Sequence, residues 1–273
     1  MFNFLIPLCL ALVLLSKPSP NDWKILVPGL DIINISSKSK SVTSNSKITV
    51  IRINPDKWEL VFLGRSLTND SFGKTAREWC ESNKLTAAIN AGMFQGDNYT
   101  HVGYSKIKDH INSKQPNNYQ SVLAFDPKNE KLNPPIRILD LDDTGVTITT
   151  ILKDYNSAVQ NLRLIKRSGI NVWAQQEREW SEAAIGEDSK GNILFIFSRS
   201  PFSMHDFNKV LLESGIGIVA AQHLEGGPEA QIYLKTGNFE LEQFGSFETN
   251  YIEDDSNTNP WPIPNVLGIR PKE

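Results

Sequence analysis

The sequence predicts an α+β fold in which a mixed, largely antiparallel sheet is flanked by helices within a single domain. Residues 47–54 alternate between apolar and polar side chains, several of them β-branched, which is typical of a half-buried strand. Compact apolar runs that predict buried strands lie at residues 85–90, 192–198 and 216–223. Helical patterns occupy residues 74–83 and 203–215, so helices should pack beside the strands.

Length and charge limit the class of protein. The chain has 273 residues, of which 40% are hydrophobic, so it can bury one sizeable core without needing a second domain. The formal net charge is only −3, and the 28 Lys and Arg residues are scattered rather than gathered in a run. Because no basic stripe is available to face a phosphate backbone, we do not expect nucleic acid as a partner.

The N-terminus has the pattern of an export signal. Residues 1–16 form an apolar run too short for a comfortable membrane span, and the breaker-rich residues 17–20 follow it. We therefore predict a signal peptide at residues 1–20, an N-terminal extension at 21–45 and one domain at 46–273, in a protein exported to the periplasm or beyond. No Lys or Arg precedes the run and no A-x-A site follows it, so a buried N-terminal helix or an uncleaved membrane anchor stays open as an alternative. Membrane contact is expected only through such a segment.

Removal of the signal peptide would leave Cys80 as the only cysteine, which excludes an intramolecular disulfide. Cys80 lies in the helical pattern at residues 74–83, where a small buried side chain is more common than a nucleophile. Stability is therefore expected to come from the core.

Turn residues separate most of the expected elements. The Pro-Asp turn between residues 47–54 and 58–62 predicts a hairpin. Residues 95–118 are polar with little periodicity and predict a loop, whereas residues 154–168 mix helical and extended signals. Other strands are expected at residues 122–125 and 136–140, and a surface loop at residues 253–259.

Residues 192–235 predict the order strand, helix, strand, turn, strand. Ser203 and Asp206 have the spacing of a capping box and should start the helix that runs to Gly215. The apolar run that follows ends at Glu225 and two glycines, which indicates a turn at the end of a strand.

Two polar-glycine motifs, each at the C-terminal end of an apolar strand, form the candidate site. The first is Asn90-Ala-Gly92 and the second is His223-Leu-Glu-Gly-Gly-Pro-Glu229. Glycines allow positive φ and close approach of backbone N–H groups to a ligand, and His223 and Glu225 should share a face because they are two residues apart on a strand. The alternative is a plain hairpin turn at the glycine pair, with the neighbouring glutamates exposed on it.

Five motifs occur in the order found in the phosphodiester glycosidase family. They are A-I-N-A-G-M-F at 88–94, V-G-Y at 102–104, A-A-I-G at 183–186, H-L-E-G-G-P-E-A at 223–230 and P-N-V-L-G-I at 264–269. Each motif alone is weak, but together they make the chain resemble this family over nearly the whole length that follows the export segment. The resemblance implies a hydrolase that releases a sugar from a phosphodiester.

The resemblance also implies site residues. The family's asparagine-glycine turn falls on Asn90 to Gly92, its following aromatic residue on Phe94, and its glycine before a strand that enters the site on Gly103. Its N-L-D-G-G-G-S-S motif falls on residues 223–230 and assigns substrate binding to His223, Gly226, Gly227 and Glu229, with Glu225 in place of Asp. Its Arg-Thr pair falls on Glu182 and Ala183, so this chain has lost that Arg, and His and Glu replace the family's Asn and Ser at positions 223 and 229.

We expect Glu225, Glu182 and Asn90 to be the catalytic residues. A phosphate ester is a weak base that leaves with little protonation, so a carboxylate serves best to position water or to stabilise an oxocarbenium-like transition state. That role is assigned to Glu225, with Glu182 as the second carboxylate and Asn90 and His223 as hydrogen-bond partners of the substrate. Asn90, Glu182 and Glu225 should then line one cleft, and Gly226 or Gly227 should need a positive φ. The open alternatives are that His223 is a satisfied buried residue and that Glu182 is a solvated loop residue.

A phosphate among carboxylates requires cationic groups, and the loss of the family's Arg removes one. The candidates nearest in motif order are Arg178, Arg199 and His205. Arg199 is the main candidate, since it follows a buried strand and precedes the helix N-terminus at Ser203, where backbone N–H groups favour an anion.

The sequence predicts neither a metal nor a cofactor. Acidic residues at 140–143 and 253–255 could bind Ca²⁺, but neither stretch matches an EF-hand loop, and H-E-x-x-H, G-x-G-x-x-G and G-K-[ST] motifs do not occur.

The expected function is an exported hydrolase that acts on a glycosyl phosphodiester or a related surface glycan, with a carbohydrate or sugar phosphate as substrate. The alternative is a catalytically inactive glycan-binding module on the same fold, which the replacement of Arg and Ser by Glu favours.

Overall fold

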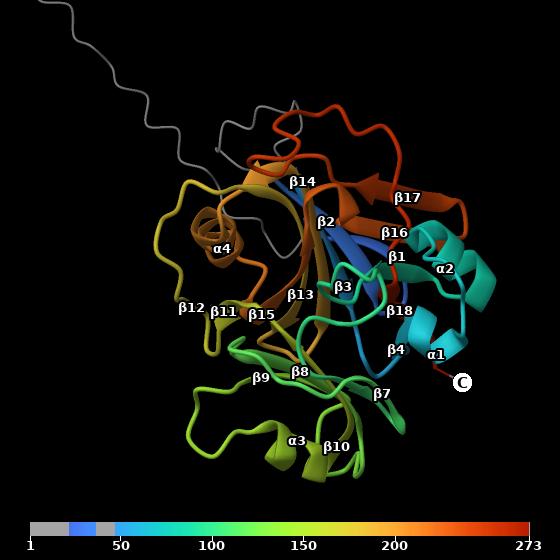
Figure 1. Cartoon of the computed structure of the whole chain (residues 1–273), viewed down its shortest axis with the longest axis vertical. Helices are drawn as coiled ribbons and strands as arrows, with labels where there is room; N and C mark the ends of the chain where they lie inside the picture. The colour runs from blue at the N-terminus through green and yellow to red at the C-terminus, as the bar shows by residue number, and fades with distance from the viewer. Residues whose placement is uncertain (1–21, 37–46, 273) are drawn as a thin grey trace, which may run out of the picture.

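Strands dominate the structure, a computed structural model that describes residues 22–36 and 47–272. The predicted signal peptide at residues 1–20 lies outside the described residues. Within them the strands form one sheet of eight strands and two of five, and all of the strand pairings are antiparallel. The predicted α+β class with a mixed sheet is therefore corrected to a more β-rich, antiparallel one, with α-helices at the periphery (Figure 1).

The eight-stranded sheet carries the strands of the second motif. Its order is β1 (Lys24–Val27), β2 (Leu30–Ser36), β3 (Lys47–Ile53), β14 (Ile193–Phe202), β13 (Trp180–Asp188), β15 (Ile218–Gly226), β11 (Arg163–Lys166) and β12 (Ile170–Asn171). Residues 24–36, predicted as part of an N-terminal extension, supply β1 and β2, and β2 pairs with β3 along its whole length. These residues thus belong to the sheet.

A second sheet carries the first motif and corrects the predicted hairpin. Its order is β17 (Phe239–Phe244), β16 (Gln231–Thr236), β5 (Ala87–Asn90), β18 (Asn265–Pro271) and β4 (Trp58–Gly64). Residues 47–54 and 58–62 are strands, but they do not pair: β3 pairs with β2 and β14, whereas β4 pairs with the C-terminal β18. The Pro-Asp turn carries the chain from one sheet to the other, and the apolar side chains of β3 and β4 meet in the core that the sheets share.

The third sheet has the order β7 (His110–Ser113), β6 (Ser105–Ile107), β10 (Tyr155–Asn161), β8 (Ser121–Pro127) and β9 (Ile136–Asp140). Residues 95–118, predicted as a loop, therefore contain two short strands. The mixed signals at residues 154–168 arise because α3 (Ile148–Asp154) ends where β10 begins, and β11 follows one residue after β10.

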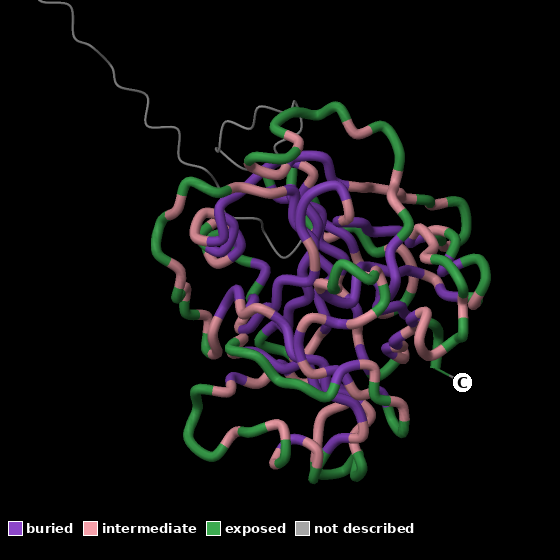
Figure 2. The backbone as a smooth tube through the Cα atoms, in the orientation of Figure 1, coloured by how far each residue is buried: buried purple, intermediate pink, exposed green. Residues whose placement is uncertain are grey.

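The main core lies where the three sheets meet. Its buried side chains include Phe195 of the large sheet, Ile89 and Leu267 of the second sheet, and Leu123 of the third. Figure 2 shows the buried backbone running through the middle of the molecule, with the exposed segments around it. The ends of β5 and β15, which carry the two motifs, therefore come from sheets that share one core.

Helices cover the outer faces of the sheets. The longest, α4 (Met204–Glu213), packs Phe207 and Leu211 against the large sheet, while α2 (Ala76–Asn83) packs Trp79 against the second. The short α1 (Arg65–Thr68) follows β4. In the described residues, no helix is both long enough and apolar enough to cross a bilayer.

The helix predicted after Ser203 begins at the expected cap, and α2 begins at a cap that was not predicted. The Ser203 hydroxyl accepts from the Asp206 N–H at 3.1 Å and starts α4, although the Asp206 carboxylate accepts from Gln175 rather than completing a capping box. Thr75 and Glu78 form a complete box at α2. Cys80 is buried in α2, and burial raises the pKa of its thiol, which confirms the prediction of a packed rather than a reactive side chain.

Candidate active site

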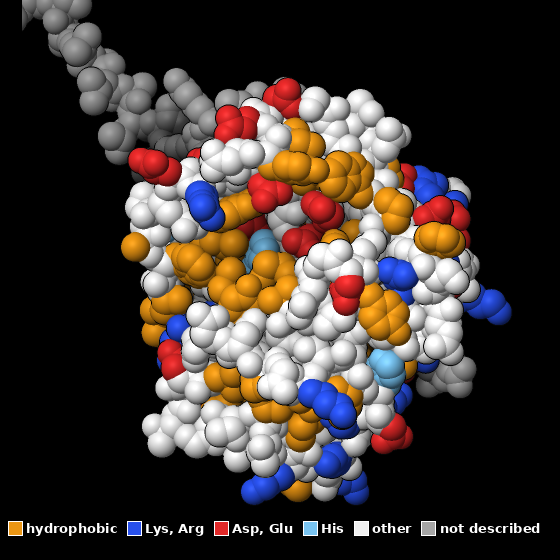
Figure 3. Space-filling view, in the orientation of Figure 1, with side chains coloured by type: hydrophobic (Ala, Val, Ile, Leu, Met, Phe, Trp, Pro, Cys, Tyr) orange, Lys and Arg blue, Asp and Glu red, His pale blue; other side chains and the backbone are white. Residues whose placement is uncertain are grey.

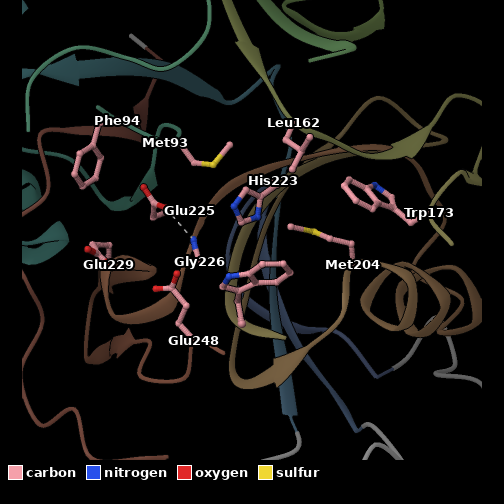
Figure 4. Close-up of a pocket in the computed structure, with 11 residues that line it drawn as sticks. Met93, Phe94, Leu162, Trp173, Met204, His223, Glu225, Gly226, Glu229 and Glu248 are labelled. Carbon is pink, nitrogen blue, oxygen red and sulfur yellow. Dashed lines mark hydrogen bonds between the residues drawn. The ribbon is translucent and has the colours of Figure 1, made fainter. Parts of the chain in front are cut away.

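A pocket of about 320 Å³ opens at the end of β15. Its polar lining is His223, Glu225, Gly226, Glu229 and Glu248, and its apolar lining is Met93, Phe94, Leu162, Trp173, Trp180 and Met204. Figure 3 shows a histidine at the floor of a hollow, with acidic side chains on one side and hydrophobic ones on the other. The close-up agrees: Glu225, Glu229 and Glu248 gather on one side of His223, and Trp173 and Met204 lie on the other (Figure 4).

Neighbouring strands bring Glu182 of β13 against His223 of β15. The two strands pair with a bulge beside Ala184, which lies opposite His223. The Nδ1 atom of His223 is 2.7 Å from Oε2 of Glu182, and the two side chains are 5% and 0% exposed. Because the carboxylate engages Nδ1, the other ring nitrogen, Nε2, is left for the pocket. It can donate a hydrogen bond when the imidazole is charged and accept one when it is neutral.

The Glu182–His223 pair is electrostatically coupled. Burial lowers the pKa of His223, but the carboxylates of Glu182 and Glu225 more than offset that effect, so the pKa of His223 is raised. Burial raises the pKa of Glu182 by more than His223 lowers it. The Oε1 atom of Glu182 is buried and has no hydrogen-bond partner among the described residues. His223 is therefore the main group that compensates the charge of Glu182.

Glu225 lies two residues after His223 on β15 and also lines the pocket, as the strand spacing predicts. Its Oε1 atom accepts a hydrogen bond from the Gly226 N–H at 3.2 Å (Figure 4). Burial raises the pKa of Glu225 to about 8; His223 opposes this shift, and the charges of Glu229 and Glu248 add to it. At neutral pH this carboxyl group therefore carries a proton most of the time and can act as an acid.

Glu225, Glu229 and Glu248 together form what we call the acidic side of the pocket. Burial raises the pKa of Glu229, and the charge of Glu248 raises it further; burial also raises the pKa of Glu248. None of the three makes an ion pair within the described residues. The three carboxyl groups therefore repel one another whenever they are ionised.

The glycine pair after Glu225 turns the chain so that Glu229 also lines the pocket. Gly227 has a φ of +65°, which confirms the prediction that one of the two glycines needs a positive φ. It starts a short 3₁₀ turn (Gly227–Glu229) rather than the plain hairpin of the alternative interpretation. A Cβ atom on Gly227 would lie 2.7 Å from Oε2 of Glu248, so the glycine also makes room for that carboxylate.

Asn90 supports this turn from behind and does not line the pocket. Its Nδ2 donates to the Glu229 carbonyl at 2.8 Å, and its Oδ1 accepts from the Gln231 N–H at 2.6 Å. Glu182 is likewise buried behind His223. The expectation that Asn90, Glu182 and Glu225 share one cleft therefore fails for the first two, because both side chains are buried away from the pocket.

Gly92 and Gly103 are also supporting residues. Gly92 has a φ of +148°, and a Cβ atom there would lie 2.3 Å from Oδ1 of Asn161 and 2.4 Å from Cε1 of His101. The Asn161 Nδ2 donates to the Ala91 carbonyl at 3.1 Å. At Gly103 a Cβ atom would lie 2.6 Å from the Gln160 carbonyl oxygen. These close backbone contacts fix the segment that carries Met93 and Phe94 into the pocket.

The three predicted cationic residues lie outside the pocket lining. Arg199 donates to the carbonyls of Phe244 and Asn257, each at 2.7 Å, and also pairs with Asp255, so its guanidinium holds the segment after β17. The His205 Nδ1 is 3.0 Å from Asp206, and Arg178 is exposed. Within the lining, His223 is the residue that can carry positive charge.

Sequence patterns missed several lining residues. The only sequence signal that could have placed Trp173 and Trp180 at the site is that both tryptophans occur in an otherwise polar stretch. Glu248 has no motif, and its place depends on an isolated bridge to Trp180. In residues 22–36 and 47–272, no group of three His, Cys, Asp or Glu side chains could hold a metal ion.

Comparison with known proteins identifies a matching protein family. The sequence matches the family described as phosphodiester glycosidase over residues 83–270. A search of curated proteins finds no match.

Solved structures share the fold at low identity. The catalytic domain of zebrafish N-acetylglucosamine-1-phosphodiester alpha-N-acetylglucosaminidase, auto-inhibited by its pro-peptide, is 13% identical, with a TM-score of 0.59 over 89% of each chain. A hypothetical protein from Synechocystis is 15% identical, with a TM-score of 0.59 over 89% of this chain and 62% of that one. A candidate exported protein of Burkholderia pseudomallei is 10% identical, with a TM-score of 0.52 over 82% and 74%.

Replacing Gly92 with Ala should destabilise the protein, because the new Cβ atom would clash with Asn161 and His101 at a φ that L-residues rarely adopt. We expect a loss of roughly 2–4 kcal/mol in the free energy of unfolding, measured by denaturant titration. The matched control is Gly96→Ala, where a Cβ atom meets nothing within 4 Å. Equal stability of the two variants would contradict the packing described for Gly92.

Replacing Glu182 with Gln should lower the pKa of His223, because burial would then act without the opposing carboxylate. The chain has four His residues, so an NMR titration of the imidazole signals can follow each of them. The exposed Glu130→Gln variant serves as control and should leave the His223 titration unchanged. An unchanged His223 pKa in the Glu182→Gln variant would show that the buried contact does not set its charge.

The stability of the protein should fall as pH rises between 4.5, the ordinary pKa of a glutamate, and about 8, the pKa of Glu225 in the fold. In that window the folded state binds more protons than the unfolded state, so deprotonation favours unfolding. The decline should be smaller in Glu225→Gln, which has no proton to lose, as thermal unfolding across the pH range would report. If wild type and variant have parallel pH profiles, the carboxyl group of Glu225 titrates normally.

Proposed function

The chain belongs to the phosphodiester glycosidase family, and we propose that it is a hydrolase that cleaves a glycosyl phosphodiester or a related linkage of a surface glycan. One observation carries the proposal: buried Glu182 contacts Nδ1 of His223, so that Nε2 remains available at a pocket that Glu225 also lines. Burial raises the pKa of Glu225 to about 8, which suits a proton donor. A proton acceptor and a proton donor next to each other are what acid–base hydrolysis requires.

The proposed reaction divides the work between these two residues. The neutral form of His223, which the raised pKa makes more abundant as pH rises, accepts a proton from the attacking water at Nε2, and Glu182 stabilises the resulting imidazolium through Nδ1. Glu225 donates a hydrogen bond or its proton to the leaving oxygen, which matters most where the leaving group is more basic than a phosphate ester. Glu182 thus acts through His223, and Asn90 acts by holding the turn that carries Glu229. Neither of them contacts the substrate.

The two sides of the pocket suggest how a sugar would bind. Carboxylates on the acidic side can accept hydrogen bonds from sugar hydroxyl groups, while Phe94, Trp173 and Met204 offer apolar surface to the ring faces or to the leaving group. Met204 is the first residue of α4, so a phosphate would be placed most favourably near that helix N-terminus and His223, away from the acidic side.

Export of the protein is part of the proposal. The apolar N-terminal run followed by Pro-rich residues supports it, and a candidate exported protein has a similar fold. The substrate would then be a glycan outside the cytoplasm.

A glycan-binding module without catalysis is the second candidate. It is favoured by the absence of Lys and Arg from the pocket lining in the described part of the chain, since a phosphate would lack the bidentate clamp that Arg provides.

Purified protein should hydrolyse a chromogenic sugar-1-phosphodiester, and Glu225→Gln and His223→Gln should each lower kcat by about 10²–10⁴, the usual contribution of a general acid or base. The exposed Glu130→Gln variant should keep wild-type activity. Hydrolysis in ¹⁸O-labelled water identifies the bond, because label in the sugar means C–O cleavage and label in the phosphate means P–O cleavage. Binding of the substrate without turnover would reject the hydrolase and support the binding module.

A further inference from the structure

The acidic side of the pocket brings three carboxyl groups together in a lining that contains no Lys or Arg. Glu225, Glu229 and Glu248 line one side of the same pocket, and a Cβ atom on Gly227, two residues from both Glu225 and Glu229, would lie 2.7 Å from Oε2 of Glu248 (Figure 4). Elsewhere the described acidic residues are often paired, as Asp142 is with Arg163 at 2.7 Å. Glu225 holds a proton at neutral pH and has His223 beside it, whereas Glu229 and Glu248 have no Lys or Arg in the lining to pair with. Carboxyl groups that repel one another on ionisation do not stabilise the fold, so a structural role does not explain them.

A second observation points from this cluster to a ligand. His223 is only 5% exposed, and no hydrogen-bond partner is described for its Nε2 in residues 22–36 and 47–272, although the residue lines the cavity. A ring nitrogen at the cavity wall without a protein partner can form a hydrogen bond with a ligand there. The pocket is therefore built to receive a polar ligand.

An aromatic wall adjoins the same carboxylates. The ring of Trp180 packs over Gly226, where an added Cβ atom would lie 3.2–3.3 Å from it, and the backbone of Trp180 bridges to Glu248. Aromatic faces attract cations and stack against the apolar faces of sugar rings. Carboxylates beside an indole thus form a setting that favours an organic cation over an anion.

We propose that the acidic side of the pocket binds a sugar that carries a protonated amino group, with the ammonium among Glu225, Glu229 and Glu248. The proposal rests on the proposed function only in taking the ligand to be a sugar. An ammonium group relieves the repulsion among the carboxylates, which a neutral hydroxyl or acetamido group cannot do, and a phosphate on this side would increase it. Within the described residues no group of three acidic, His or Cys side chains could hold a metal ion, whereas an ammonium group needs only one or two of these carboxylates as direct partners.

Binding can be tested on the whole protein with small glycosides. The probes are the methyl glycosides of glucosamine, of N-acetylglucosamine and of glucose, together with the galacto-configured set, because the stereochemistry is not fixed by charge. Affinity is measured by calorimetry and by the quenching of tryptophan emission, to which Trp173 and Trp180 of the lining contribute. The amino form should bind roughly ten- to a hundredfold more tightly than its acetylated partner, the range for a hydrogen bond to a charged group.

Substitutions on the acidic side test whether charge, rather than shape, produces the preference for the amino form. Glu229→Gln and Glu248→Gln should each shrink the difference between the amino and acetylated forms, while Glu130→Gln should leave it unchanged. The melting temperature of Glu248→Gln should be higher than that of the wild type at alkaline pH, because the substitution removes repulsion; a carboxylate with a structural role would give the opposite shift.

Several outcomes would overturn the proposal. The first is that acetylated or neutral glycosides bind as tightly as the amino form, or that no probe binds. The second is that the preference for the amino form survives both Glu229→Gln and Glu248→Gln. The third is that Ca²⁺ or Mn²⁺ alone binds and that both substitutions abolish this binding. Its failure is distinct from failure of the proposed function. Equal hydrolysis of amino and acetylated substrates would support the proposed function and contradict this inference. Selective binding of the amino form without turnover would support this inference and contradict the proposed function.

Discussion

The contact between Glu182 and His223 is the constraint on which the rest of the site depends. Glu182 lies on β13, between β14 and β15 in the large sheet, and its carboxylate is 0% exposed. A buried carboxylate is tolerated only with a partner, and the ring nitrogen at 2.7 Å provides it. The same contact that makes the burial possible also fixes which nitrogen of His223 is available to the pocket.

The pocket is assembled from the ends of strands that belong to different sheets. β15 of the large sheet delivers His223 and Glu225, and the segment after β5 of the second sheet delivers Met93 and Phe94. Asn90 joins the two parts, since its side chain binds the backbone at Glu229 and Gln231. Such a junction is rigid because each end is held by its own ladder and by the shared core, which suits a site that must hold side chains in place.

Charges are distributed unevenly between the site and its surroundings. Arg199, which was predicted to contact a phosphate, instead donates hydrogen bonds to two carbonyl groups and pairs with Asp255. Arg163 lies between Asp140 and Asp142, and the carboxylate of Glu187 faces Arg137 at 2.8 Å. Cations are thus used to stabilise the structure around the pocket, while the carboxylates inside it are left uncompensated. Local conflicts of this kind are expected at functional sites, where stability is traded for binding.

Local patterns determined most of the longer strands, the two helices at residues 74–83 and 203–215, the capped start of α4 and the two motifs. Alternation, apolar runs and cap residues depend only on neighbours in the chain. They also placed His223 and Glu225 on one face. Tertiary structure decided the partners: β4 pairs with β18, which is far away in sequence, and not with β3, since register and sheet membership depend on which apolar faces meet in the core. It likewise decided that Glu182 is buried, that Arg199 is engaged elsewhere and that Glu248 reaches the pocket, because burial and charge pairing depend on residues far apart in sequence.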